Sequence, residues 1–429
     1  MFVLEEGMLL NVYKAMMRAG TPLLEAYLKR REGRGKEDPA RAHERRGRAT
    51  LPRANGALAW FHAASVGESL SLLAIISRVL ETYPHLQVMV TTGTVASARL
   101  MADRLPPRAF HQYMPVDHPA WVATFLDHWQ PDFVVWSESE FWPNMLSAIK
   151  SRGIPAVLMN ARMSEASFRR WKWAKGAIAD ILSVFSLCLA QNAGEAQRLE
   201  QLGAKNVRVA ANVKYAAAPL PVDEEKLAAM QSQVSGRKII LWASTHAGEE
   251  QLALETHAAL RPQFPDLLTI IVPRHAPRGP DVLALAQQKS LSVGLRSRND
   301  AASEIYIADT MGELGLFYRL CKIAVVGGSF ADIGGHNPIE PGQLGCVIFY
   351  GTEMYNFITI NEDFLTAQAA VQVADANALK TKLAEALAAP EKFASYGDNA
   401  RRLTAEKSIA ASALASMLDP YLEKLAVAS

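Results

Sequence analysis

The fold is decided by ALAWFHAASVGESLSLLAIISRVLETYPHLQVMVTTG, residues 57–93, which has the pattern of a strand, a helix and a second strand. The runs at its two ends, 57–64 and 86–93, are apolar and too short for typical helices. Between them, residues 68–83 have the apolar spacing of an amphipathic helix. Apolar strands that alternate with helices are typical of a parallel sheet covered on both faces. The stretch therefore predicts one unit of a doubly wound α/β domain.

The same alternation continues along the chain and restarts once. A Pro-rich stretch, residues 216–221, separates two series of strand-like runs and is a plausible linker. The Ala-rich segment 376–426 has a helical pattern. The pattern therefore predicts two successive Rossmann-like halves. The further runs are 109–116, 132–139, 155–163, 186–192 and 207–212 before the linker, and 238–245, 267–274, 304–309, 323–328 and 346–351 after it.

Composition excludes some classes of function. The chain has 429 residues, 45 basic and 43 acidic, so its formal net charge is only +2. Bulk charge therefore does not favour a polyanion, and we expect no nucleic-acid partner. The three cysteines include no C-x-x-C pair, which favours buried free thiols in a reducing compartment and no metal site.

The N-terminus is apolar and then basic. Polar residues and the helix-breaking Gly20-Thr21-Pro22 interrupt the apolar segment 8–28, so a simple transmembrane helix is not expected. Between Lys29 and Arg53, basic residues outnumber acidic ones by ten to four. This order suits a helix that lies on an anionic membrane surface. The alternative is a core-packing helix followed by a solvated basic linker.

Acidic residues follow two strands of the first half, where open α/β sheets bind ligands. Glu68 follows the first predicted strand, three residues after Ser65. This spacing is a capping box, which needs no function, but a carboxylate there is also suited to act as a general base. Glu138 and Glu140 follow the fourth predicted strand on an extended segment, so their side chains should point to opposite sides.

In the second half, the loops after the strands are rich in hydrogen-bond donors. Residues 244–250, STHAGEE, precede a helix and fit either an ordinary N-cap or a site for phosphate or sugar hydroxyls. Arg274 ends the next strand and offers a planar guanidinium to a phosphate. Thr310 and Glu313 have the spacing of another capping box.

The last glycine-rich loop, residues 327–340, has the sequence GGSFADIGGHNPIE. Asn337 is expected to be the N-cap of the following helix, with Pro338 as its first residue and Glu340 in its first turn. Glycines before a helix N-terminus let backbone N–H groups point at an anion. The carboxylate of Glu340 is explained by the cap, but it would also suit a ribose diol.

The chain contains a series of distinctive motifs. In order, they are HAASVGES (62–69), TTGTVASA (91–98), SESEFWPN (137–144), NARMSEASFRR (160–170), QNAGEAQRLEQLGA (191–204), ASTHAGEE (243–250), IVPRHAPR (271–278), DTMGEL (309–314) and GGSFADIGGHNPIEP (327–341). In combination, these motifs resemble the 3-deoxy-D-manno-octulosonic acid (Kdo) transferase family of lipid A assembly over roughly residues 36–360. The resemblance implies a GT-B fold, with two Rossmann-like domains facing across a cleft and a short N-terminal membrane-associating helix.

The resemblance also implies a domain plan and a place in the cell. Residues 1–35 would associate with the membrane, residues 36–215 would form the acceptor domain, and residues 222–429 would bind the nucleotide sugar. The last helix would cross back to the first domain. The protein would act at the cytoplasmic face of the bacterial inner membrane, as a peripheral or monotopic protein.

The reaction implied is an inverting transfer of Kdo from CMP-Kdo to the 6′-hydroxyl of a tetraacyl lipid A precursor, with no metal and no cofactor. Glu68 would be the general base, and Glu138 and Lys214 would stabilise the transition state. Where the family often has Asp after its Lys-Phe, this chain has Ala216 after Lys214-Tyr215. The residues implied in binding CMP are Pro273, Arg274, Met311, Gly312, Glu313, Asn337, Pro338, Ile339 and Glu340.

Two other interpretations of the chain stay open. It could be another GT-B enzyme that uses a different nucleotide sugar, such as a UDP-sugar transferase or a sugar-nucleotide epimerase. It could also be a non-catalytic, membrane-peripheral nucleotide-binding protein. The set formed by Glu68, Glu138, Lys214 and Arg274 favours an enzyme, because a binding protein does not need a base.

Overall fold

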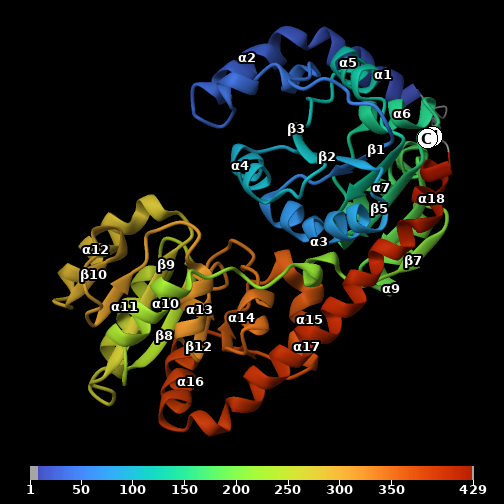
Figure 1. Cartoon of the computed structure of the whole chain (residues 1–429). Helices are drawn as coiled ribbons and strands as arrows, with labels where there is room; N and C mark the ends of the chain where they lie inside the picture. Colours follow the sequence, from blue (N-terminus) through green and yellow to red (C-terminus); the bar gives the residue numbers. More distant parts are fainter. Residues whose placement is uncertain (1–7, 428–429) are drawn as a thin grey trace. The chain divides into compact units, whose positions relative to one another are not determined.

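The structure is a computed structural model that describes residues 8–427 (Figure 1). The chain divides into two compact units, of which unit 1 is formed by residues 1–217 and 407–429 and unit 2 by residues 218–406. Residues 1–7 of the predicted membrane-associating segment and residues 428–429 of the second predicted domain lie outside the described residues.

Unit 1 is built on a parallel sheet of seven strands in the order β3-β2-β1-β4-β5-β6-β7. The order reverses between β1 and β4, so this pair is the topological switch point of the sheet, where doubly wound folds bind ligands. Its strands are β1 (Leu58–His62), β2 (Gln87–Thr92), β3 (Ala109–Tyr113), β4 (Phe133–Ser137), β5 (Ala156–Ala161), β6 (Phe185–Ala190) and β7 (Val207–Val209). Its helices are α1 (Met8–Ala19), α2 (Thr21–Glu32), α3 (Val66–Thr82), α4 (Val95–Arg104), α5 (Pro119–Trp129), α6 (Pro143–Ser151), α7 (Glu165–Lys172), α8 (Lys175–Leu182), α9 (Ala193–Gln201) and α18 (Asp419–Val427), with the short η3 (Val213–Ala216).

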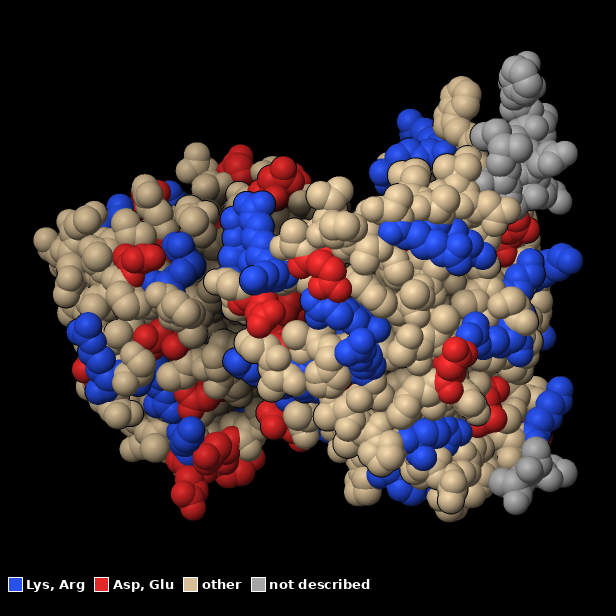
Figure 2. Space-filling view, turned by 90° about the horizontal axis from the view of Figure 1, so that it is seen from above, with Lys and Arg blue, Asp and Glu red and all other residues tan. Residues whose placement is uncertain are grey.

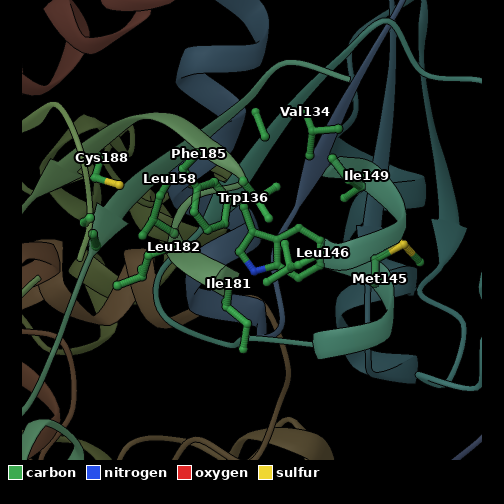
Figure 3. Close-up of a cluster of buried hydrophobic side chains, with 14 of the residues drawn as sticks. Val134, Trp136, Met145, Leu146, Ile149, Leu158, Ile181, Leu182, Phe185 and Cys188 are labelled. Atoms are coloured by element: carbon green, nitrogen blue, oxygen red, sulfur yellow. The ribbon is translucent and has the colours of Figure 1, made fainter. Parts of the chain in front are cut away.

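The core of unit 1 surrounds Trp136, whose ring lies among the aliphatic side chains of β4, β5, α6 and α8 (Figure 3). The side chain is fully buried, and its Nε1 donates to the backbone oxygen of Glu140 at 2.9 Å. A large aromatic side chain buried in this way orders the end of β4. It therefore fixes the start of the segment that carries Glu138 and Glu140.

The basic segment is largely folded onto unit 1 and is not a solvated linker. Several of its arginines have intramolecular carboxylate partners. Arg31 contacts Glu37 at 2.6 Å, and Arg41 contacts the fully buried Glu44 at 2.8 Å. Arg45, Arg46 and Arg53 pair with Glu37, Glu25 and Asp132, respectively.

The predicted break at Gly20-Thr21-Pro22 is confirmed, because α1 ends at Ala19 and α2 begins at Thr21. Proline near the start of a helix loses no intrahelical hydrogen bond, which explains the new start. Within residues 8–427, no helix is both long enough and apolar enough to cross a membrane.

All three cysteines of the chain are buried free thiols, as predicted.

Unit 2 repeats the plan with the strand order β10-β11-β9-β8-β12-β13-β14, and its switch point lies between β8 and β12. The strands of unit 2 are β8 (Lys238–Thr245), β9 (Leu267–Pro273), β10 (Val293–Leu295), β11 (Ile305–Ile307), β12 (Ile323–Val326), β13 (Val347–Tyr350) and β14 (Val371–Gln372). Its helices are α10 (Glu224–Gln233), α11 (Glu249–Leu260), α12 (Gly279–Gln288), α13 (Leu314–Leu320), α14 (Ile339–Gln343), α15 (Ile358–Thr366) and α16 (Ala376–Ala388), and α17 (Ala394–Ser412) runs from unit 2 into the C-terminal part of unit 1.

Candidate functional site

Glu68 lies at the switch point of unit 1, in the first turn of α3 after β1. Ser65 caps this helix, and its hydroxyl donates to Glu68 Oε1 at 2.7 Å. The backbone N–H of Ala64 donates to Glu68 Oε2 at 3.0 Å. Burial raises the pKa of Glu68 to about 7, and the nearby negative charge of Glu138 acts in the same direction. The predicted capping interaction is therefore present, on a carboxyl group that titrates near neutral pH.

Glu138 follows β4 and forms an ion pair with Lys214, at 3.0 Å between Oε1 and Nζ. Both side chains are 18% exposed, so water reaches the pair only in part. Asn160 joins them, because its Nδ2 donates to Glu138 Oε1 at 3.3 Å and its Oδ1 accepts from the N–H of Val213 at 3.2 Å. The charges of Glu138 and Lys214 both act on Glu68, so the structure brings the three predicted catalytic residues together in unit 1.

Asn160 is a residue of this site that the sequence interpretation missed. Both Asn160 and Glu138 have left-handed backbone conformations, with φ of +57° and +58°. Asn adopts this conformation more readily than most residues, whereas for Glu it is strained. Such strain is concentrated at functional sites. The only available signal was an Asn at the end of a buried strand in the NARM motif.

Lys214 is held by the short helix η3 rather than by an acidic neighbour at position 216. The side chain of Asn212 caps this helix and accepts from the N–H of Lys214 at 3.0 Å. The cap on η3 therefore orders the backbone of Lys214, while position 216 is an alanine.

Glu138 and Glu140 have different partners. Glu140 Oε2 accepts from Trp142 Nε1 at 3.2 Å and lies 3.7 Å from His62 Nε2. Burial acts to raise the pKa of Glu140, but nearby His62 and the hydrogen bond from Trp142 lower it overall. Of the two carboxylates, Glu138 is the one that contacts Lys214.

In unit 2, the buried Glu249 joins the loops that follow β8 and β12. Its Oε2 accepts from the N–H of His246 at 3.0 Å and of Gly328 at 2.7 Å, and its Oε1 accepts from Phe330 N–H at 3.1 Å. Glu249 was not predicted as a site residue. Its signal was weak, because a Glu at the start of a helix is usually explained by the helix dipole.

The glycines after β12 are required by close backbone contacts. A Cβ on Gly327 would lie 2.5 Å from the carbonyl oxygen of Ser244, and Gly328 has a left-handed φ of +69°. The predicted helix start after this loop is wrong by one residue, because α14 begins at Ile339 with Pro338 at the N-cap position. Asn337 still caps the helix through its side chain, because its Oδ1 accepts from Ile339 N–H at 3.1 Å.

Arg274 and Glu340 lie at this edge of the second sheet. Arg274 is exposed, follows Pro273 at the end of β9, and donates its backbone N–H to Thr245 at 2.9 Å. Burial raises the pKa of Glu340 to about 7, whereas a hydrogen bond from Asn337 and the charge of Arg274 act to lower it. The Asn337–Glu340 segment and Arg274 thus lie within electrostatic reach of each other.

The predicted capping box at Thr310–Glu313 is wrong in its register, since α13 begins at Leu314 with Glu313 itself at the N-cap position. The carboxylate of Glu313 contacts Arg296 at 2.9 Å and Lys226 at 3.1 Å, and hydrogen bonding from Arg296 lowers its pKa to about 2. The side chain is therefore already occupied by cations. A ligand could therefore contact the exposed side chain of Met311 and the backbone of Gly312 in the turn before α13.

Each unit thus offers one kind of chemistry. Unit 1 places a carboxyl group of near-neutral pKa beside a lysine–glutamate pair, an arrangement that can accept a proton from a hydroxyl. Unit 2 places a guanidinium and imidazoles near the ends of β8, β9 and β12, and a guanidinium suits a phosphate. The expectation that the glycine-rich loop offers its backbone N–H groups to an anion is wrong for Gly327, Gly328 and Gly335, because these groups donate to Ala243, Glu249 and Gly328.

Comparisons with known proteins identify the family to which the chain is similar. The family model described as 3-deoxy-D-manno-octulosonic-acid transferase (kdotransferase) matches residues 40–217. The 3-deoxy-D-manno-octulosonic acid transferase of Rickettsia felis is 33% identical over 371 residues, which cover 85% of this chain and 78% of that protein. The enzyme of the same name from Haemophilus influenzae is 32% identical over 388 residues, covering 88% and 90% of the two chains.

Among solved structures, a putative UDP-N-acetylglucosamine 2-epimerase from Listeria monocytogenes has a TM-score of 0.60. It is 10% identical in sequence and covers 86% of this chain and 98% of its own. At this identity the likeness shows the fold alone. The fold is GT-B, with two Rossmann-like domains.

Proposed function

Because the chain belongs to the Kdo transferase family, we propose that it transfers Kdo from CMP-Kdo to the 6′-hydroxyl of a tetraacyl lipid A precursor. In this proposal the anomeric carbon is inverted in a single displacement, and Glu68 is the general base. The reaction would place the protein in the assembly of the lipopolysaccharide core. No metal takes part in the proposed step.

The observation that carries the proposal is the raised pKa of Glu68, at the switch point of unit 1. A general base works best when its pKa lies near the working pH, and burial raises the pKa of Glu68 to about 7. The Glu138–Lys214 pair, at 3.0 Å, supplies a fixed dipole beside it. A preorganised charge of this kind stabilises charge that develops in a transition state.

Unit 2 supplies groups that fit the donor. Arg274 can hold a phosphate through its planar guanidinium. The protonated form of Glu340 or its anion can hydrogen-bond a ribose hydroxyl. Among the predicted CMP-binding residues, only Glu313 has its carboxylate occupied by cations, so its contribution would come through the backbone of the turn.

Product analysis by mass spectrometry tests the function. The purified full-length protein is incubated with CMP-Kdo and a tetraacyl lipid A precursor, and we expect mass increments of one or more Kdo units on the lipid. Competition by free CMP, but not by free UDP, would support the donor. A folded protein that binds CMP and gives no increment would contradict the acceptor, and preferential binding of UDP would favour a different nucleotide sugar.

We also propose that unit 1 docks on an anionic membrane surface through α1 and α2. These helices expose an apolar stripe, which consists of Leu9, Val12, Met16, Leu23 and Tyr27. Exposed basic residues flank the stripe, among them Arg18, Lys29 and Arg30. On the face of unit 1 in Figure 2, Lys and Arg side chains are spread among broad uncharged areas. An apolar face with basic flanks suits a helix lying in an anionic interface.

The double variant Leu23→Ser/Tyr27→Ser tests this docking. We expect about tenfold or greater loss of binding to vesicles of phosphatidylethanolamine and phosphatidylglycerol, because burying a leucine contributes ~1.5–3 kcal/mol. Co-sedimentation of protein with vesicles measures the effect. Ile409→Ser is the matched control, because Ile409 is 75% exposed on α17, outside the stripe. Equal sedimentation of the wild type and the double variant would contradict the proposal.

A further inference from the structure

Two histidines of unit 2 share a hydrogen bond at the switch point of the second sheet. The Nε2 atoms of His246 and His336 are 2.8 Å apart, and the two rings are nearly parallel, with an interplanar angle of 6°. At this distance one nitrogen carries the hydrogen and the other offers its lone pair. A doubly protonated pair would point two N–H groups at each other. The contact is therefore compatible with a neutral pair or with one extra proton, but not with two.

The surrounding loops hold the two rings in place. Glu249 accepts from the backbone N–H of His246 and also from that of Gly328, so it joins the loops that carry the two histidines. Gly328 packs directly on His336, since a Cβ there would lie 3.1 Å from Cδ2 and 3.3 Å from Nε2. The N–H of Gly335 closes the loop by donating to the oxygen of Gly328 at 2.8 Å.

Burial, helped by nearby positive charge, disfavours protonation of the pair. Burial lowers the pKa of His336 to about 3, with further contributions from His246 and Arg274, and burial also lowers the pKa of His246. An anion beside Arg274 would cancel part of this positive field and raise both pKa values. The ionisable groups that act on the pair are Arg274 and His275 after β9, and Glu249 and Glu250 on α11.

We propose that the His246–His336 pair takes up one proton when the phosphate of the donor binds beside Arg274, and that the resulting imidazolium stabilises the departing CMP. The inference rests on the proposed function and adds residues that the resemblance does not assign. Neither histidine has another role in the proposed reaction.

The charge balance of the transfer explains why such a proton is useful. The phosphodiester of CMP-Kdo carries one negative charge. When the bond between the anomeric carbon and the phosphate oxygen breaks, the electron pair stays on that oxygen, and the phosphate of CMP gains a second negative charge. The acceptor oxygen forms the new bond to the anomeric carbon, and its proton passes to Glu68. The imidazolium then offsets the added charge on the phosphate, and its proton stays on the histidine pair.

Calorimetry of CMP binding tests the uptake. Titrations at about pH 8, where free CMP is already a dianion because its second phosphate pKa is about 6, are repeated in two buffers of different ionisation enthalpy. The buffer dependence gives the number of protons taken up. We expect the wild type to take up more protons than His336→Gln and His246→Gln, in which only other groups near the phosphate, such as Glu340 with its pKa of about 7, change their protonation. The expected loss of CMP affinity in these variants is about tenfold, the effect of one hydrogen bond to a charged group.

His275→Gln is the matched control, because His275 is exposed next to Arg274 and its ring lies 6.0 Å from that of His246. It should take up protons as the wild type does. Unchanged uptake in both pair variants, or no uptake by the wild type, would overturn the inference and leave the transfer of Kdo untouched. Failure of the wild type to bind CMP would instead contradict the proposed function. Thermal unfolding of each variant identifies any that fail to fold.

A kinetic readout separates this role from a purely structural one. With CMP-Kdo as donor, kcat of His336→Gln should fall more than the affinity for CMP, because the added charge on the phosphate develops only as the bond breaks. The dependence of the rate on the ionisation of Glu68 should stay unchanged. A fall in CMP affinity with unchanged kcat would assign the pair to binding alone and would overturn its role toward the leaving group.

Discussion

Glu68→Gln is expected to lower kcat for Kdo transfer by about 10²–10⁴, the range that general-base catalysis contributes. The amide is almost the same size as the carboxylate, and its oxygen can still accept from the Ala64 N–H while its NH₂ group donates to Ser65 Oγ, but it cannot take a proton. The affinity for CMP, measured by calorimetry, should remain within about twofold of the wild type, well under the 1.4 kcal/mol of a tenfold change.

Glu81→Gln is the matched control for this variant, because Glu81 is an exposed glutamate on the same helix, α3. It should have wild-type activity. Loss of CMP binding or of thermal stability together with kcat in Glu68→Gln would assign Glu68 to capping or folding. Retention of more than about a tenth of the wild-type rate would contradict its role as the base, because general-base catalysis supplies at least about 10².

The pH dependence of the same residue gives a separate prediction. A base must be deprotonated to act, so kcat/KM should rise with pH and level off above about 7, where Glu68 is ionised. Rate measurements in overlapping buffers over this range test the position of the rise. A profile that rises instead near the ordinary glutamate pKa would contradict the burial effect on Glu68.

The raised pKa of Glu68 also has a cost in stability. Because the folded-state pKa of about 7 lies above the ordinary value, the folded protein binds this proton more tightly than the unfolded chain does. The free energy of unfolding therefore falls as pH rises from the ordinary carboxyl pKa to about 7, through the contribution of this group. Glu68→Gln removes that contribution, so at about pH 8 it should unfold at a temperature no lower than the wild type.

The predicted runs overlap every strand in the described residues except the edge strands β10 and β14. The run 238–245 coincides with β8, and the run 267–274 exceeds β9 by one residue. The edge strands β10 and β14 have three and two residues, and runs so short give no periodicity. The alternation of strands and helices along the chain also does not predict the order of the strands in each sheet. That order depends on the face of the sheet over which each connecting helix crosses.

Within the candidate site, local motifs were predictable and long-range contacts were not. The Ser65–Glu68 cap depends on residues three apart, and it is present. The bond from Val213 to Asn160 joins residues 53 positions apart, and the left-handed backbone of Asn160 has no pattern in the sequence. Similarly, Arg46 in the basic segment pairs with Glu25 across a turn of the chain, so counting charges overstated how much of that segment is free for a membrane.

Lys214→Met is expected to lower kcat by about 10²–10³, comparable with the loss of one preorganised donor to developing charge. Lys214→Arg should retain part of the activity, because it keeps the positive charge but changes the geometry of the donor. Steady-state kinetics with CMP-Kdo measures both variants. Lys205→Met is the control, because Lys205 is an exposed lysine after α9, outside the site.

The pairing of Lys214 with Glu138 makes the double variant informative. If the lysine acts mainly by holding Glu138 at 3.0 Å, then Glu138→Gln/Lys214→Met should be no slower than the slower single variant. If each residue stabilises the transition state separately, the two losses in activation free energy should add. Wild-type activity in Lys214→Met would remove both roles and leave η3 as a purely structural element. The structure favours the first outcome over additive losses. Asn160 bonds both to Glu138 and to the backbone of η3, which carries Lys214, so a change at Glu138 or at Lys214 should disturb the position of the other.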